Sequence, residues 1–77
     1  MAMDLGSYRY LAVDPDMVGG QPYVKGTRLS AAFILSCLAQ GMTVEEISET
    51  YVPIPAEAVR EVLRLAAEVL DAGSMAT

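Results

Sequence analysis

The sequence predicts a single, mainly α-helical domain in which three helices follow a short N-terminal β-hairpin. Apolar residues recur with helical spacing in three segments of residues 30–71, and capping or helix-breaking residues separate these segments. Residues 8–28 instead combine aromatic and β-branched residues with glycine- and proline-containing turns, which is typical of a hairpin and turn. With 77 residues, the chain has room for one domain, which we take as residues 1–77 with a frayed tail at 72–77.

The hairpin is predicted from two extended segments separated by a turn. The first, Tyr8–Val13 (YRYLAV), ends at an Asp-Pro pair that favours turning. The following DPDMVGG run predicts a turn or a single helical turn, closed by Gly19 and Gly20. The second strand, Gln21–Lys25, can pair with the first. Because two short strands are marginally stable alone, we expect the hairpin to pack on the helices or on a second copy of the chain.

The first helix is expected between Ser30, as its N-cap, and Gly41, as the residue that ends it. Its predicted core face contains apolar residues at i, i+3, i+4 and i+7, namely Ala31, Ile34, Leu35 and Leu38. Phe33 and Cys37 lie on another face, so this helix is apolar on most sides. A helix of that kind is usually buried on most sides, which predicts contact with a second chain.

The second and third helices are predicted from a capping box and two prolines. In the run Thr43-Val44-Glu45-Glu46, the threonine and the second glutamate can each bond the other's backbone amide. The helix that begins there runs to about Tyr51, and its predicted buried residues are Val44, Ile47 and Tyr51. Pro53 and Pro55 end it, and Pro55 suits the first turn of a third helix that extends to about Asp71. The apolar stripe predicted for the third helix is Val59, Val62, Leu63, Ala66, Val69 and Leu70.

The apolar content predicts self-association. Hydrophobic residues make up 53% of the chain and the mean hydropathy is +0.36, which is more apolar material than a small monomer readily buries. We therefore expect a homodimer, with Tyr8, Tyr10, Phe33 and Cys37 as candidate interface residues. Cys37 is the only cysteine and lies in an apolar run, so we expect a reduced, buried and inert thiol.

Several functional classes are excluded by what the chain lacks. With no histidine and one cysteine, neither a zinc site nor another transition-metal site is expected, and no cofactor motif is found. Without histidine, the chain has few residues that could pair as a catalytic nucleophile and its general base, so we do not expect an enzyme. Residues 1–10 lack the pattern of a signal peptide, and the uncharged stretch Leu29–Val44 is too short and too polar to span a membrane. These observations predict a soluble cytoplasmic protein.

The charge distribution limits where nucleic acid could bind. The net charge of −5 opposes DNA binding, but residues 1–30 sum to zero and the whole excess of acid falls in residues 31–77. Two helices joined at Gly41-Met42, the second starting T-x-E-E-I, are found in DNA-binding helix-turn-helix units, but the pattern alone favours a purely structural helical hairpin. The candidate contacts for DNA or another anion are Lys25, Thr27, Arg28, Arg60 and Arg64.

The segment GGQPYVKGTRLS, residues 19–30, has a structural and a functional interpretation. Gly26 lies between a strand and a helix, so we expect it to turn the chain with a positive φ while the Thr27 hydroxyl fixes the corner. Alternatively, Lys25 and Arg28 flank a helix start that favours anions, although Arg28 could instead pair with Glu45 or Glu46. The segment matches neither glycine-rich nucleotide-binding motif.

Two further groups of residues also allow two interpretations each. Arg60 and Arg64 share a helix face and could straddle phosphates, or they could form intrahelical ion pairs with Glu57 and Glu61. The tyrosines near the N-terminus could stack on nucleic-acid bases or pair with one another across the hairpin; these are Tyr8, Tyr10 and Tyr23.

The run GGQPYVKGTRLSAAFILSCLAQGMTVEEISETY, followed by VREVLRLAAEVL, resembles the small prokaryotic proteins grouped as domain of unknown function 433. The resemblance covers about Tyr8 to Leu70, and its most specific part is Gly20–Leu29. It implies a dimeric helix-turn-helix domain of the homeodomain-like or winged type, with a β-hairpin ahead of it. Many such proteins are similar to VapB-type antitoxins, whose genes lie beside that of a PIN-like nuclease toxin.

The resemblance therefore leads us to expect an antitoxin-like regulator that binds operator DNA and a PIN-like toxin. The alternative is a dimeric module that binds a basic partner protein and not DNA. This chain departs from the antitoxin pattern in two respects. Only about six residues follow the last predicted helix, where a toxin-blocking extension is usual, and Glu57, Glu61 and Glu68 accompany the two arginines of the third helix.

Overall fold

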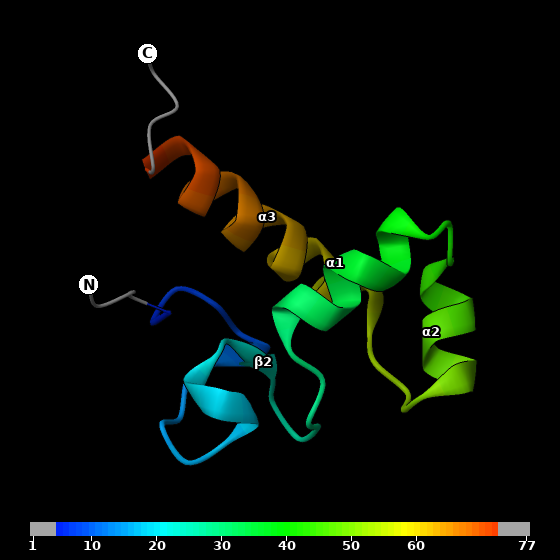
Figure 1. The fold of residues 1–77 in the computed structure, drawn as a ribbon, viewed down its shortest axis with the longest axis horizontal. Coiled ribbons are helices and arrows are strands. Elements are labelled where there is room, and N and C mark those ends of the chain that lie inside the picture. Colours follow the sequence, from blue (N-terminus) through cyan, green and yellow to red (C-terminus); the bar gives the residue numbers. More distant parts are fainter. Residues whose placement is uncertain (1–4, 73–77) are drawn as a thin grey trace.

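Three α-helices and a two-stranded antiparallel sheet make up the described part of the chain, residues 5–72, in the computed structural model (Figure 1). The elements in chain order are β1 Leu11–Ala12, the 3-10 turn η1 Val18–Gly20, β2 Tyr23–Val24, α1 Ala31–Ala39, α2 Val44–Thr50 and α3 Ala56–Ala72. The predicted mainly helical class with an N-terminal hairpin is thus confirmed. Of the tail predicted at 72–77, the first residue is the last of α3 and residues 73–77 lie outside the described part. None of the helices in residues 5–72 is both long enough and apolar enough to cross a membrane.

The hairpin is shorter than the sequence predicted. Strands β1 and β2 pair antiparallel in the register Leu11 with Val24 and Ala12 with Tyr23. After β2 the chain reverses, so that the Val24 amide donates to the Leu29 carbonyl at 3.0 Å and Tyr23 forms a bridge with Ser30. Because β2 is bonded on both sides, this two-residue strand is more firmly held than its length suggests, and it connects the N-terminal segment to the start of α1.

Gly26 and Thr27 form the corner between β2 and α1, as predicted. The Thr27 amide donates to the Val24 carbonyl at 3.0 Å, which closes a four-residue turn, and Gly26 at its third position has φ 80°. That value belongs to a type II turn, which glycine adopts without strain. The Thr27 hydroxyl donates to the Val24 carbonyl at 2.8 Å and accepts from the Leu29 amide at 3.0 Å. The corner is therefore built from internal hydrogen bonds and requires no ligand.

Replacing Gly26 by Val is expected to lower the free energy of unfolding by about 1–2 kcal/mol, because a left-handed backbone strains an L-residue with a branched β-carbon. No atom lies within 4 Å of an added β-carbon, so this loss would be conformational and not a clash. Urea denaturation followed by circular dichroism measures it. Gly26→Asn is the matched control, since asparagine tolerates this conformation and should lose less. Equal stability of the glycine and valine proteins would contradict the turn assignment.

The predicted helix caps are present. Ser30 Oγ accepts from the Phe33 amide at 2.9 Å at the start of α1. At the other end Gly41 has φ 93°, its amide donates to the Leu38 carbonyl at 2.9 Å, and the Met42 amide donates to the Cys37 carbonyl at 3.1 Å. This pair of bonds is a Schellman motif, in which glycine takes the left-handed position.

The α2 capping box is also formed. The Thr43 amide donates to Glu46 Oε1 at 2.8 Å and the Glu46 amide donates to Thr43 Oγ1 at 3.1 Å. Each helix start is therefore fixed by bonds within four residues of sequence, which is why both could be predicted.

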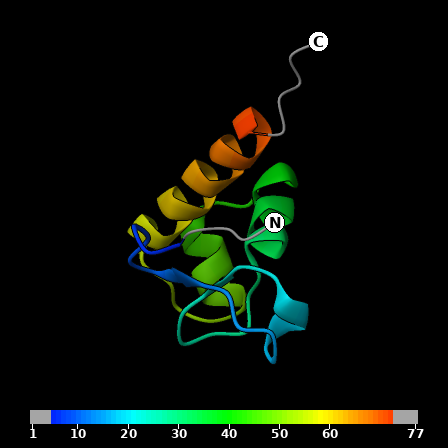
Figure 2. The same cartoon turned by 90° about the vertical axis from the view of Figure 1, so that its left-hand side faces the viewer.

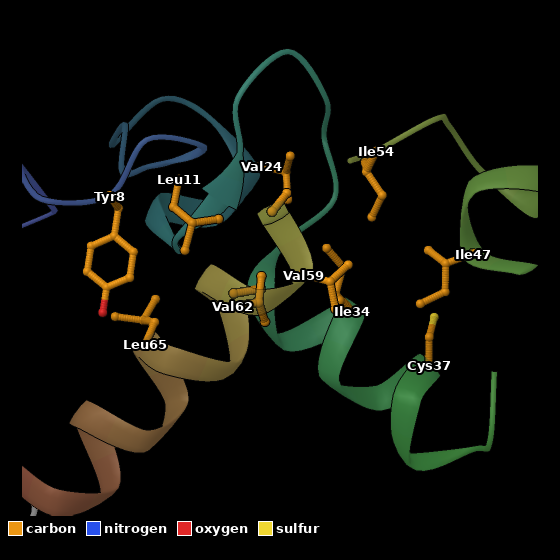
Figure 3. Close-up of a cluster of buried hydrophobic side chains, with 12 residues drawn as sticks. Tyr8, Leu11, Val24, Ile34, Cys37, Ile47, Ile54, Val59, Val62 and Leu65 are labelled. Carbon is orange, nitrogen blue, oxygen red and sulfur yellow. The ribbon is translucent and has the colours of Figure 1, made fainter. Parts of the chain in front are cut away.

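One hydrophobic core joins the hairpin and all three helices (Figure 3). Its most deeply buried large side chains come from β1, β2 and each of the three helices, and they are Leu11, Val24, Ile34, Ile47 and Val62. The buried face of α3 consists of Ala58, Val59, Val62 and Leu65. The predicted stripe was therefore partly wrong: Leu63, Val69 and Leu70 are exposed, whereas Leu65, which the prediction omitted, is buried.

The buried faces of the two shorter helices also differ from the prediction in detail. In α1, Ala31 and Ile34 are buried as expected, but Cys37 takes the third buried position while Leu35 and Leu38 are half-buried. Tyr51, expected in the core after α2, is 45% exposed and packs edge-on against Phe33 with ring centroids 4.9 Å apart. The C-terminal end of α3 extends beyond the rest of the described chain in both views (Figures 1 and 2), and Val69 and Leu70 near this end are exposed.

Candidate nucleic-acid interface

The segment just before β1 is held by α3 through a carboxylate. Glu61 Oε1 accepts from the Tyr10 amide at 2.8 Å and Glu61 Oε2 accepts from the Arg9 amide at 2.9 Å. Both oxygens of one side chain thus bind consecutive backbone N–H groups that lie more than fifty residues away in sequence. Hydrogen bonds to an ionised acceptor are stronger than neutral ones, so Glu61 fixes the backbone of residues 9–10 against the helix.

One and two turns further along α3, Arg64 and Glu68 hold residues 7 and 8. The Arg64 guanidinium carbon lies 4.1 Å from the centroid of the Tyr8 ring, and Arg64 Nη2 donates to the Ser7 carbonyl at 3.2 Å. The Tyr8 hydroxyl donates to Glu68 Oε1, and the Tyr8 side chain is only 4% exposed. An arginine stacked on an aromatic ring keeps the edge of its guanidinium available for an anion.

These contacts raise the pKa of the Tyr8 phenol above its ordinary value of 10.0. Burial is the largest cause, and the bond to Glu68 adds to it, whereas Arg64 acts in the opposite direction. The pKa of Arg64 is also raised, mainly by its contact with Tyr8, so Arg64 is positively charged at neutral pH.

Because the pKa of Tyr8 is higher in the folded chain than in the unfolded chain, its contribution to stability is complete below about pH 10 and is lost as the pH rises further. We expect Tyr8→Phe to remove the part of the loss of stability at alkaline pH that comes from ionisation of the Tyr8 phenol. The measurement is urea denaturation of both proteins between pH 7 and pH 11, taking the difference at each pH. A difference that does not change with pH would contradict the assignment. Tyr51→Phe is the control, since Tyr51 is 45% exposed.

Four of the five cationic residues lie in the segment of residues 7–10, next to it, or on the turns of α3 that hold it. The Lys25 amide donates to the Tyr10 carbonyl at 2.8 Å, which places Lys25 beside Arg9 and Tyr10. Arg64 contacts Ser7 and Tyr8, and Arg60 lies one turn before it on the same side of α3. We call Arg9, Lys25, Arg60 and Arg64 the basic cluster; all four are exposed.

The predicted contact residues are thus only partly brought together. Arg28 is exposed and lies beyond the turn, and the Thr27 hydroxyl is already used within it. In residues 5–72 no ion pair joins Arg28 to Glu45 or Glu46, or Arg60 to Glu57 or Glu61. Glu61 binds the backbone of residues 9–10 instead, so the predicted intrahelical pairing was wrong for it.

Helix α2 has the opposite charge character. Glu45, Glu46 and Glu49 are exposed, and α2 contains no lysine or arginine. Figure 1 shows α2 at the other end of the long axis from residues 5–10. The turn at Gly41-Met42 that suggested a helix-turn-helix therefore leads into an acidic helix, and phosphate contact would have to come from α3 and the N-terminal segment.

The four predicted interface residues do not share one exposed surface. Tyr8 and Cys37 are buried within a single chain, with 4% and 3% of their side chains exposed, so they have little surface to offer a second copy. Tyr10 and Phe33 are half-buried. The position of Cys37 agrees with the buried thiol expected from the sequence.

Sequence reasoning missed Glu61, Glu68 and Ser7 as parts of this site. Their contacts span 51 to 60 residues of sequence, and neither spacing nor charge pattern identifies which carboxylate of α3 meets the N-terminal segment. A weak signal existed in the alternation of Glu61, Arg64 and Glu68 along one side of α3.

The fold and the site define a small helical domain with an N-terminal hairpin, whose cations gather around residues 7–10 and whose acids dominate α2. A family model described as "Protein of unknown function (DUF433)" matches residues 11–66, so the chain belongs to that family. The match includes β1 through most of α3 and leaves out the segment that contains Arg9 and Tyr10. No curated protein and no solved structure matches the chain.

Proposed function

We propose that this chain is a DNA-binding regulator of the antitoxin type, which acts as a cytoplasmic homodimer and has a PIN-like toxin as its protein partner. The DNA-binding unit in this proposal is a helix-turn-helix of the homeodomain-like or winged type. The observation that carries the proposal is the basic cluster, because phosphate contacts by lysine and arginine supply most of the affinity of a protein for DNA.

Two features of the cluster support this use. Arg64 is stacked on Tyr8 and Arg9 lies 5.8 Å from the centroid of the Tyr10 ring, so both guanidinium groups are partly ordered before any ligand arrives. The carboxylates nearest to them, Glu61 and Glu68, already accept hydrogen bonds from residues 8–10, which reduces their capacity to bind the arginines. A dimer would present two such clusters.

The test measures binding of the purified protein to its own upstream DNA, beside a random duplex of equal length, over a series of salt concentrations. Selective binding that weakens with salt is expected. Arg60→Ala should lower the slope of log affinity against log salt by about 2 in a dimer, since each phosphate contact contributes about 0.9. Absence of selective binding at low salt would overturn the proposal.

Glu49→Gln is the matched control, because Glu49 is an exposed residue of α2, which lies far from the N-terminal segment (Figure 1). We expect it to leave the salt slope unchanged. A loss equal to that of Arg60→Ala would mean that total charge, and not the basic cluster, determines binding.

The acidic α2 favours the second candidate, a dimeric module that binds a basic partner protein and not DNA. Here Glu45 and Glu49 would contact the partner, whereas Glu46 is retained for the capping box. Co-purification with the product of the neighbouring gene distinguishes the two candidates. Loss of the complex in a Glu45→Gln, Glu49→Gln double variant, with no loss in Arg60→Ala, would favour the interaction module.

A further inference from the structure

An apolar groove of about 420 Å³ lies between α1 and the C-terminal half of α3. Pro22 and Leu35 lie on one side and Ala66, Val69 and Leu70 on the other, and Gln21 is the one lining residue with a polar side chain. Leu70 is 63% exposed and Val69 is 45% exposed. Apart from Gln21, the side chains that line the groove offer no hydrogen bond or charge to a polar ligand, so its occupant must be apolar where it meets them.

Beside the groove, α3 exposes an apolar stripe that the core does not use. Leu63, Ala66, Ala67 and Leu70 follow each other at i, i+3, i+4 and i+7, with two leucines flanking two alanines. Leu63 is 48% exposed, and Ala67 and Leu70 are exposed as well. This spacing is that of a helix-pairing face, and the small central residues permit two helices to approach closely.

We infer that a second copy of this chain covers the groove, with its α3 antiparallel to the first and the two-fold axis near Ala66 and Ala67. A two-fold contact uses the same patch on both chains, so Leu70 of each chain can enter the groove of the other while Leu63 meets Leu70 of the partner subunit. A helix from a different protein could fill the groove and still leave the Leu63 side of the stripe in water.

Charge along α3 supports the antiparallel orientation. The N-terminal half of α3 contains both of its arginines, Arg60 and Arg64, beside Glu57 and Glu61, whereas its C-terminal half contains Glu68 and Asp71 and no cation. Antiparallel packing places Arg60 near Asp71 of the partner subunit, whereas parallel packing would place the two acidic halves together. This interface differs from the one expected around Tyr8 and Cys37, and it explains how the chain can self-associate although those residues are buried.

The inference rests on the homodimer of the proposed function and adds the surface that forms it. The test is sedimentation equilibrium at micromolar concentration, where the wild type should be a dimer of the 8.2 kDa chain. Leu70→Glu should weaken association at least about 100-fold, since it puts two charges into two apolar grooves. Val13→Glu is the matched control, because Val13 is 45% exposed and does not line the groove, and it should remain dimeric.

Disulfide trapping tests the orientation. Ala67→Cys should form a covalent dimer on mild oxidation, because the two copies of residue 67 lie beside the two-fold axis. Ala56→Cys is the control, since Ala56 is exposed at the other end of α3 and the antiparallel arrangement places its two copies far apart. A folded monomer in the wild type, a dimer unaffected by Leu70→Glu, or equal cross-linking of both variants would overturn the inference.

DNA binding is measured separately, so the two proposals can fail independently. A monomer that binds its upstream DNA selectively would overturn the interface and leave the basic cluster in place. A dimer that Leu70→Glu dissociates but that ignores DNA would support the interface and remove the DNA-binding proposal.

Discussion

Ile34→Ala is expected to lower the free energy of unfolding by about 2–5 kcal/mol, which is the largest effect that we expect from a single substitution. Ile34 has no exposed surface, and it extends from α1 into the hydrophobic core to which Val59 of α3 also belongs (Figure 3). Removing its outer carbons withdraws apolar surface from the core and leaves a cavity between two helices. A chain of this length has a total stability of roughly 4–12 kcal/mol, so the variant should unfold at a markedly lower urea concentration than the wild type.

Urea denaturation followed by circular dichroism measures this loss. Ile34→Val is the matched control, because it removes one methyl group and should lose about 0.5–1.5 kcal/mol. If Ile34→Ala lost no more than Ile34→Val, the site would not be a packed part of the core. Both variants keep the N-cap of α1, since Ser30 and the Phe33 amide are unchanged.

The features predicted correctly from the sequence are those determined by neighbouring residues. The Ser30 cap, the capping box of Thr43 and Glu46, and the Gly26 corner each depend on contacts within four residues. Local hydrogen bonds and the conformational freedom of glycine determine these structures, so they can be predicted without knowledge of the tertiary fold. The ends of α1 and α2 were therefore predicted to within two residues.

The features that were predicted incorrectly depend on tertiary contacts. In α3, the apolar residues form two adjacent faces, one with Val62 and Leu65 and one with Leu63 and Leu70. Periodicity alone does not show which of the two meets α1 and β1. The predicted stripe combined residues from both faces. The misplaced half of the stripe, with Leu63, Val69 and Leu70, is exposed in the single chain, and it is the half that we propose a second chain covers.

Candidate site residues illustrate the same distinction. Charge and spacing identified Arg60 and Arg64, but not what they contact, and intrahelical pairing was the simplest local solution. Glu61 instead bonds the backbone of residues 9–10, and Arg64 packs on Tyr8. Bonds between segments this far apart depend on how the hairpin docks on α3, which no local pattern specifies.

Glu61→Ala is expected to produce the second large effect, a loss of about 2 kcal/mol in the free energy of unfolding. The substitution removes both acceptors of the Arg9 and Tyr10 amides. Bonds to a charged acceptor are worth roughly 1.5–3 kcal/mol each when well protected, and the half-buried position of Glu61 reduces the sum. Urea denaturation gives the total. Glu57→Ala is the matched control, because Glu57 is an exposed glutamate one turn earlier in α3 and should change stability by less than about 0.5 kcal/mol.

Hydrogen exchange then shows where the stability is lost. If Glu61 acts as a clamp on the N-terminal segment, the Arg9 and Tyr10 amides should exchange much faster in Glu61→Ala than in the wild type, and by more than the global loss of stability explains. The amides of α1, which Glu61 does not contact, should change only in proportion to the global loss. Uniform acceleration of all amides would instead mean that Glu61 supports the fold as a whole. In that case the N-terminal segment would be held by the hydrophobic core and by Arg64, and Glu61 would not be needed to position Arg9.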